Sequence, residues 1–336
     1  MKGTHPVLVV PCRRGGIPYL TPEQARDILE EEERVVSLCI FDAHEYRTVC
    51  ASTQRGFTEF CGLADFKLIL TVRSSLVGMH ASAPASDTAV SGDHGKGRLS
   101  FHSGQWLELV TSLRPTMAVT LYDSVPLHEL NPRRRKTTSN RSLKWANAAD
   151  SLQHTLGCEL IKPYGTTGEK ATYVYAGNLC QNELIEQYYC HLREAVESHQ
   201  VMAPAMSVGA VLMALMAGVT LIECPLPWVL AERGVALTLN LKPVPGETPR
   251  RYESQIDLND PYFAVDIGPL SPSCVCYTCK RHNRAYLHHL LTVQEMNSDI
   301  LLVIHNLSSM VQLVRQYRRS SAEDRHTLLS WIFAQL

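Results

Sequence analysis

The sequence lacks the glycine-rich patterns by which many enzymes hold phosphate groups. Neither G-x-G-x-x-G nor G-x-x-x-x-G-K-[ST] occurs in its 336 residues, so a dinucleotide-binding fingerprint and a P-loop are excluded. It also lacks an excess of one charge, because 32 Lys and Arg accompany 33 Asp and Glu. This balance argues against a generally basic nucleic-acid coat and leaves local basic patches as the places where RNA could bind.

The opening letters, MKGTHPVLVVPCRRGG, predict a short strand and a turn rather than the charged and then apolar pattern of a secretory leader. The 11 cysteines are odd in number and scattered in spacing. Both features favour reduced thiols in the cytosol or nucleus. Nothing in the sequence resembles a transit peptide or a lipid anchor, so we expect any membrane association to be peripheral.

The most apolar stretch, residues 201–230, is long enough to resemble a membrane span. Prolines and glycines interrupt it, and Glu223 lies inside it. We therefore predict a buried strand–helix–strand passage, with a strand to about 208, a helix over about 210–217 and a second strand over about 220–224.

Short apolar runs alternate with amphipathic stretches along the first two thirds of the sequence. The predicted strands are 5–12, 35–42, 66–72, 116–123, 171–177 and 234–241, and the predicted helices are 21–31, 103–113, 141–156 and 181–199. This recurrence indicates a parallel sheet, and its length favours an α/β fold of the TIM-type (β/α)8 barrel class over an open sheet. The small and polar segment 82–97 predicts a surface loop.

Two of these helices carry signals that are specific enough to test. Helix 21–31 has Thr21 as its N-cap, Pro22 at its first position, and Gln24 to complete a capping box. Helix 141–156 is predicted to bury one apolar face. The residues of that face are Leu143, Ala146, Ala149 and Leu152.

Three cysteines, Cys274, Cys276 and Cys279, form a C-x-C-x-x-C pattern, and His305 follows 26 residues later in an amphipathic stretch. Three thiolates and one imidazole make a closed tetrahedral site, which is typical of one structural zinc ion. No exchangeable position would remain, so such a metal would not activate water.

Spacing alone leaves the fourth ligand open. His282, His288 and His289 lie closer to the cysteines than His305 does. An alternative without metal also exists, in which the cysteines are packed thiols and His305 is an ordinary core histidine.

The stretch CVCYTCKRHNRAYLHHLL (274–291), with HN at 305–306, resembles the zinc-binding subdomain of the tRNA-guanine transglycosylase family. That resemblance implies zinc ligation by Cys274, Cys276, Cys279 and His305. It extends over about 97–320, and the opening of the chain is similar to the family's eukaryotic non-catalytic branch. It implies a barrel body over 1–241 and, over 242–336, a zinc-binding subdomain with C-terminal helices that pack on the barrel.

The chain departs from the catalytic members of that family where they do their chemistry. The resemblance places Glu223 at the position of their nucleophile, an Asp that attacks the ribose and expels guanine. Glu is one methylene longer, and a misplacement of roughly 1 Å can cost on the order of a hundredfold in rate. A Thr-Arg pair of their loop is Trp228-Val229 here, and a second loop Arg is Glu232. RSSLVG (73–78) stands where D-S-G-G-F-Q is expected.

Asp123 is kept, and the resemblance implies that it contacts the purine in catalytic members. The alternative is a strand-end acid that caps the next loop. The pattern as a whole implies a chain with no catalytic residue of its own. It would pair with a catalytic queuine tRNA-ribosyltransferase subunit, and the heterodimer would exchange wobble guanine for queuine in tRNAs with GUN anticodons.

Two other functions stay open at this point. One is an active transglycosylase that uses Glu223 or Asp123. The other is a zinc-bearing RNA-binding or scaffolding protein outside base exchange. The resemblance also implies a cytoplasmic location, with peripheral association at the mitochondrial outer membrane, and the nucleus stays open.

Two basic clusters are candidates for contact with tRNA phosphates, which would position the RNA without reading its sequence. The first consists of Arg133, Arg134, Arg135, Lys136 and Arg141, and the second of Lys280, Arg281 and Arg284. The alternative for each is a solvated charged face. The apolar surplus of ILLVIHNLSSMVQLV (300–314) favours a dimer interface.

Overall fold

Parallel strands close into a barrel in the computed structural model, which describes residues 5–76, 85–94, 97–123, 131–166, 171–178, 185–242 and 254–336. The order around the barrel is β1 (Val7–Cys12), β10 (Leu221–Glu223), β9 (Gln200–Pro204), β8 (Tyr173–Tyr175), β7 (Glu159–Pro163), β6 (Met117–Val119), β3 (Lys67–Thr71) and β2 (Val35–Cys39). β1 closes the ring, because it pairs with both β10 and β2. The predicted TIM-type barrel is confirmed.

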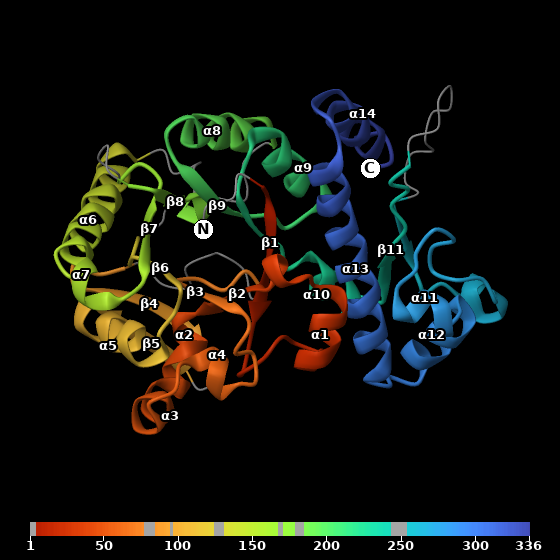
Figure 1. The fold of residues 1–336 in the computed structure, drawn as a ribbon, viewed down its shortest axis with the longest axis horizontal. Helices are drawn as coiled ribbons and strands as arrows, with labels where there is room; N and C mark the ends of the chain where they lie inside the picture. The colour runs from red at the N-terminus through yellow and green to blue at the C-terminus, as the bar shows by residue number, and fades with distance from the viewer. Residues whose placement is uncertain are drawn as a thin grey trace.

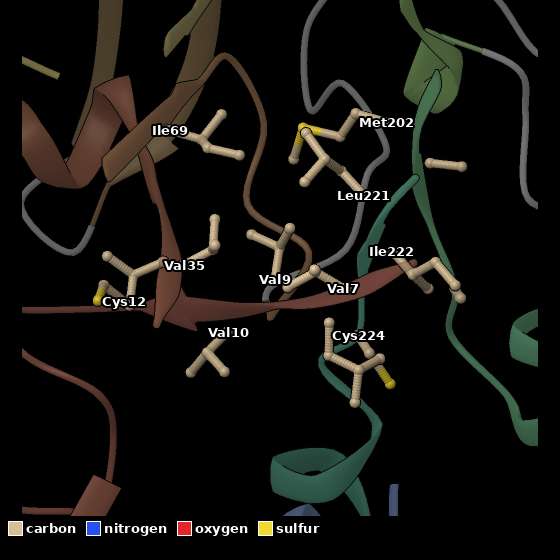
Figure 2. Packing of buried hydrophobic residues seen from close by; sticks show 14 of the residues in the cluster. Val7, Val9, Val10, Cys12, Val35, Ile69, Met202, Leu221, Ile222 and Cys224 are labelled. Atoms are coloured by element: carbon tan, nitrogen blue, oxygen red, sulfur yellow. The ribbon is translucent and has the colours of Figure 1, made fainter. Parts of the chain in front are cut away.

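Helices and 3-10 turns connect the barrel strands (Figure 1). They are α1 (Pro22–Ile28), η1 (Glu31–Glu33), α2 (Ile40–Ala43), η2 (His44–Tyr46), α3 (Arg47–Thr53), α4 (Phe57–Phe60), α5 (Ser103–Leu113), α6 (Pro132–Asp150), α7 (Gln153–Leu156), η3 (Ala176–Asn178), α8 (Ile185–Ser198), α9 (Val208–Ala217) and α10 (Leu226–Ala231). The core is built by alternation along the strands. In Figure 2, Val9 lies on the same side of β1 as Ile69 and Met202, whereas Val10 points to the other side.

The local signals at α1 are confirmed. Thr21 is the N-cap, its hydroxyl accepts the Gln24 backbone N–H, and the Gln24 side chain accepts the Thr21 backbone N–H. The predicted passage 201–230 is also confirmed, as β9, α9 and β10. Among the described residues, no helix is both long and apolar enough to cross a membrane.

The prediction for 141–156 was wrong in its bounds and in part of its buried face. α6 begins at Pro132, with Asn131 as its N-cap, and ends at Asp150. Leu143 is 41% exposed and Leu152, after the helix, is 37% exposed. The buried face of α6 comprises Thr138, Ser142, Trp145, Ala146 and Ala149. Polar residues can be buried on this face because their side chains form local hydrogen bonds, as Ser142 does to the Thr138 carbonyl.

The strands of the structure differ from the prediction in three places. The predicted loop 82–97 contains β4 (Ala89–His94), which forms an antiparallel hairpin with β5 (Gly97–His102), while 77–84 and 95–96 lie outside the described residues. β7 was not predicted from the sequence. The run 234–241 yields β11 (Val235–Leu237), which pairs with β12 (Gln255–Asp257) and not with the barrel.

The C-terminal part adds η4 (Pro261–Val265), α11 (Tyr277–Arg281), α12 (Arg284–Thr292), α13 (Asn297–Arg319) and α14 (Ala322–Phe333). α13 lies between two groups of elements (Figure 1). It packs on α10, α1 and β1 of the barrel, and on α11, α12 and β11 of the C-terminal part. The apolar surplus of 300–314 is therefore largely buried inside this chain, as the wholly covered Leu302, Val303 and Met310 illustrate.

A buried ion pair fixes α13 to the barrel side. Arg315 donates through Nε to Glu33 Oε1 at 2.9 Å, and its Nη2 also donates to the Ile28 carbonyl at 2.8 Å. Arg318 adds a bond to the same Glu33 carboxylate at 3.3 Å. Because Glu33 lies directly before β2, these bonds set the position of the long helix against the barrel.

Candidate metal centre and barrel mouth

The cysteines of the C-x-C-x-x-C pattern converge with His305. Their sulfur atoms and one ring nitrogen of His305 all lie within 4.8 Å of one another. Cys276 is the N-cap of α11, and its sulfur accepts the backbone N–H of Cys279 at 3.5 Å. This tight turn brings together thiols that are close in sequence, while α13 supplies the histidine. The four residues form a candidate metal-binding site, as predicted.

The orientation of His305 fits ligation through Nδ1. This atom lies 3.3 Å from the sulfur of Cys279 and 3.6 Å from that of Cys276. The other ring nitrogen, Nε2, lies 2.6 Å from the backbone carbonyl of Leu237 in β11. A proton on Nε2 would donate to that carbonyl, which leaves Nδ1 free to bind a metal, the usual arrangement of metal-bound histidines.

The three other histidines do not join the cluster formed by the described residues. His288 points its Nδ1 at the Leu258 carbonyl, 2.8 Å away. His282 stacks on the ring of Tyr286 at a centroid distance of 5.2 Å. The fourth ligand that the resemblance implied is therefore the one that the geometry brings to the cysteines.

The electrostatics of the cluster suit a cation. Hydrogen bonds from the thiols of Cys274 and Cys276 hold the pKa of Cys279 far below its usual range. A thiolate is the form of cysteine that binds metals. Three sulfurs and one imidazole match the donor set of structural zinc, whose role would be to fix this turn against α13.

Asn306, the residue after the histidine, links three elements. Its side-chain oxygen accepts the Leu237 N–H at 2.8 Å, and its side-chain nitrogen donates to the Val235 carbonyl at 3.0 Å. It also reaches the Pro227 carbonyl at 3.4 Å. The HN pair therefore connects the cysteine turn, β11 and the start of α10 through one turn of α13.

The barrel mouth holds Glu223, the last residue of β10, and it is 1% exposed. One oxygen, Oε1, accepts hydrogen bonds from the hydroxyls of Ser37 at 2.7 Å and Ser75 at 3.1 Å. The other oxygen, Oε2, is buried without a partner in the described residues. Burial raises the pKa of Glu223 to about 7, although the two serine hydroxyls lower it.

Aromatic side chains fill the space around this carboxylate. The rings of Tyr122 and Tyr175 are wholly buried, with centroids 5.6 Å apart. Gly177 is needed beside them, because a Cβ there would lie 2.2 Å from the Tyr175 ring. Burial raises the pKa of Tyr175 well above its usual value, and the nearby charges of Tyr122 and Glu223 add to the rise. The mouth is closed around Glu223 in this conformation.

Comparison with known proteins agrees with this geometry. Residues 182–334 match the family model described as queuine tRNA-ribosyltransferase. These residues belong to the tRNA-guanine transglycosylase family. Over 95% of its length, the chain is 24% identical to a protein of Anopheles gambiae and 22% identical to one of Aedes aegypti, and it covers 81% and 82% of them. Both are named queuine tRNA-ribosyltransferase accessory subunit 2.

A bacterial relative shares a shorter part. The queuine tRNA-ribosyltransferase of Desulforudis audaxviator is 38% identical, but over 33% of this chain and 27% of that protein. The two insect relatives named as accessory subunits thus match the chain over far more of its length than this bacterial protein does.

Trp228 and Glu232, which the resemblance places at loop positions of the catalytic members, are built into this chain's own structure. Trp228 is 1% exposed, and its indole N–H donates to the Pro18 carbonyl at 2.8 Å. Glu232 accepts the hydroxyl of Tyr19 at 3.3 Å. This region therefore carries a core tryptophan at 228 and, at 232, where the resemblance expects an arginine, an acid that bonds the loop after β1.

Asp123 is bound to α6. Its Oδ2 accepts Nη1 of Arg141 at 3.1 Å, and its backbone N–H donates to Ser142 Oγ at 3.0 Å. Arg141 also donates to Asp87 at 2.8 Å. Both charges are thus engaged inside the chain, and Arg141 is tied down rather than extended toward solvent with the rest of its cluster.

The other predicted basic residues differ in exposure. Arg133, Arg134, Arg135 and Lys136 are exposed on the first turns of α6, as are Lys280 and Arg281 on α11. Arg284 is half-buried; it pairs with Asp266 at 3.0 Å and donates to the Leu270 carbonyl at 3.2 Å. Arg284 thus holds together the segment that carries the cysteines.

The sequence reasoning missed an exposed apolar surface near the metal centre. Its members, which we call the lobe patch, are Tyr262, Val265, Ile267, Val275, Tyr277 and Tyr286, between 41% and 84% exposed. A groove of about 1000 Å³ adjoins it, lined by Val275, Tyr277 and Tyr286 and by α1 and α13 residues such as Gln24 and Ile304. No periodic pattern could have revealed this surface, because its residues come from loops and short helices.

Proposed function

We propose that this chain is the non-catalytic subunit of a heterodimeric queuine tRNA-ribosyltransferase. A catalytic partner would exchange wobble guanine for queuine in tRNAs with GUN anticodons. The accessory-subunit names of the relatives that match 95% of the chain favour this role. The proposal depends above all on the state of Glu223 at the closed barrel mouth.

A nucleophile must approach its target to about 3–3.5 Å. Glu223 is 1% exposed, and two serine hydroxyls occupy the oxygen Oε1. With a pKa of about 7, the group is also partly protonated at neutral pH, and a protonated carboxyl is a poor nucleophile. Asp123 is no better placed than Glu223 to act as a nucleophile, because its carboxylate is 6% exposed and paired with Arg141.

The surface by which the chain would bind its partner is the lobe patch with its groove. Large apolar side chains there are exposed to an extent that marks interaction sites. Exposed tyrosines such as Tyr277 and Tyr286 are typical of interface cores. A partner that covered them would bury a surface close to the metal centre, so metal loss would weaken the heterodimer as well as the lobe.

The tRNA would be held by the exposed arginines of α6 and by the cations of α11. Arg133, Arg134 and Arg135 stand at the N-terminal end of α6, where the helix dipole disfavours cations. A bound phosphate would remove that penalty. On α11, Lys280 and Arg281 keep this role in the proposal. Arg284 would act through the shape of the lobe, because Asp266 holds its guanidinium.

We assign the metal as one structural zinc ion held by Cys274, Cys276, Cys279 and His305. The Cys₃His donor set and the fixed imidazole tautomer support this choice. The proposed location is the cytoplasm, with association at the mitochondrial outer membrane as a peripheral contact; cell fractionation with a membrane salt wash tests both.

Guanine exchange into a GUN tRNA tests the function. The assay is run with this chain, with a catalytic paralogue, and with both together, each with wild-type or Glu223→Gln protein. Activity confined to the mixture and unchanged by Glu223→Gln agrees with the proposal. Exchange by this chain alone that Glu223→Gln abolishes contradicts it and makes Glu223 a working nucleophile.

A further inference from the structure

Arg73 follows β3 at the carboxyl end of the barrel strands, and it is 4% exposed. Its Nη1 donates to the backbone carbonyl of Ser91 in β4 at 2.7 Å. The ring of Phe41 lies 5.7 Å from the guanidinium centre. The two remaining nitrogens, Nε and Nη2, are buried without a hydrogen-bond partner among the described residues.

This arrangement is unfavourable unless an acceptor completes it. Arg stays protonated in proteins, so it cannot become neutral on burial. A buried charge without a partner is strongly destabilising. The Phe41 ring contacts a face of the cation and cannot accept the N–H groups that lie in the guanidinium plane. In the described part of the chain, no carboxylate lies within hydrogen-bond distance of the Nε or Nη2 of Arg73.

Elsewhere in this protein, the same edge of an arginine holds an oxyanion. The Nε and Nη2 groups of Arg26 donate to Asp65 at 3.1 and 2.8 Å. Those of Arg315 donate to both oxygens of Glu33. This two-point geometry matches planar carboxylates and phosphates. Arg73 presents the same edge, and no side chain of the described residues bonds to it.

Other polar groups at the carboxyl ends of the barrel strands are also incompletely paired. The Oγ1 of Thr120 and the Oε2 of Glu223 are buried without partners in the described residues. Burial raises the pKa of Cys39 to about 12, and the charge of Arg73 lowers it in part, which places the cation within electrostatic reach of that thiol. Ligands of TIM barrels bind at this end of the strands. Unpaired buried groups gathered there indicate a polar site.

We propose that the Nε–Nη2 edge of Arg73 binds a small oxyanion, a phosphate or a carboxylate, inside the barrel mouth. Where the transglycosylase resemblance expects the Asp of D-S-G-G-F-Q, this chain has a cation, so the site attracts hydrogen-bond acceptors instead of donors. Gly92 lets β4 lie against Phe41, because a Cβ there would be 2.6 Å from the ring. This proposal is independent of the accessory role.

The test uses the zinc-loaded full chain in potassium chloride, potassium acetate or inorganic phosphate at one pH and equal ionic strength. We expect inorganic phosphate or acetate to raise the Tm by about 2–4 °C over chloride, since a ligand of the native state stabilises it. Arg73→Met loses this rise. Arg26→Met, which removes a paired arginine, keeps it. A rise with phosphate alone assigns a phosphate site, and a rise with acetate alone assigns a carboxylate site.

A second measurement covers the case in which Arg73→Met fails to fold. In the wild-type chain, the ¹⁵Nε–¹H NMR signal of Arg73, assigned by its loss in Arg73→Lys, will shift as inorganic phosphate or acetate is added. The signal of Arg315, whose edge is filled by Glu33, will stay in place. The proposal is overturned if neither anion moves the Arg73 signal, or if Arg73→Met folds and keeps the full rise in Tm.

Discussion

Two groups of buried polar side chains, the metal centre and the barrel mouth, differ in how completely their members are paired. At the metal centre, the second ring nitrogen of His305 meets the Leu237 carbonyl and Asn306 bonds on both sides of its amide. At the mouth, Glu223 and Arg73 each keep buried atoms without partners in the described residues. The candidate metal centre is thus closely paired within the chain, whereas the barrel mouth holds buried polar atoms that other described residues do not pair.

The largest effect should come from breaking the complete site. Cys276→Ser and His305→Ala will each abolish binding of one zinc per chain and unfold the turn around α11, because structural zinc contributes about 10–16 kcal/mol in small domains. Metal analysis and hydrogen exchange over residues 274–305 will show both losses. Cys190→Ser, at an exposed thiol, is the control and will change neither. Full zinc content in Cys276→Ser would remove that residue from the ligand set.

The second prediction compares a paired buried arginine with the unpaired one. Arg315→Met leaves the buried Glu33 carboxylate with the 3.3 Å bond from Arg318 in place of its closest cationic partner, so it should cost about 3 kcal/mol in urea unfolding. The control is Arg319→Met, whose side chain is 73% exposed and 3.7 Å from Glu30; it should cost about 0–1 kcal/mol. Arg73→Met, in contrast, should leave stability in chloride unchanged or raised. Equal losses in all three variants would erase the distinction between the two regions.

The third prediction concerns the pH dependence of the mouth. The folded-state pKa of Glu223 is about 7, above the ordinary 4.5, so the native state binds more protons than the unfolded state between these values. Stability contributed by this group therefore falls as pH rises from 4.5 to 7, by at most about 1.4 kcal/mol per pH unit. Glu223→Gln removes that slope. Urea unfolding of both proteins at pH 5 and pH 7.5 measures it, and parallel pH profiles would refute the raised pKa.

The smallest effect should come from the loss of a purely local interaction, the capping box of α1. Its cost in stability is the reference for the larger effects predicted above. Thr21→Ala breaks the capping box of α1 and should cost about 1 kcal/mol. Thr53→Ala removes an exposed hydroxyl that bonds only the Val49 carbonyl, and it should stay within about 0.5 kcal/mol. A capping cost as large as that of Arg315→Met would mean that α1 contributes as much to stability as the Arg315–Glu33 ion pair does.

Local hydrogen bonds were predictable from the sequence where both partners lie within a few residues of each other. Thr21 and Gln24 are three residues apart, and their reciprocal bonds follow from spacing alone. The recurrence of strands and helices predicted the barrel, because each element has its own period. β7 was missed because Glu159 and Lys162 interrupt its apolar pattern, and Lys162 bonds Asp150 at the barrel surface.

Features that join distant residues could not be predicted from spacing. Glu223 is separated from Ser37 by 186 residues and from Ser75 by 148, so its closed environment depends on the assembled barrel. His305 was separable from His282 and His288 only through resemblance, since the choice among them depends on how α13 crosses the turn. The predicted buried face of α6 was wrong in part, because the apolar pattern does not show that Ser142 is buried through its hydrogen bonds to the carbonyls of Asp123 and Thr138.

The place of α13 between barrel and lobe has a consequence for how the chain matures during translation. β1 can pair with β10 only after the ribosome has synthesised residues 221–223. α1 and β1 also pack on α13, which begins at Asn297 and is synthesised later still. Contacts so remote in sequence form late and slowly. A nascent chain would therefore hold unpaired strand edges and uncovered apolar residues for most of its synthesis, a state that invites aggregation. Folding during synthesis, and not only final stability, would then limit how much of the protein reaches the native state.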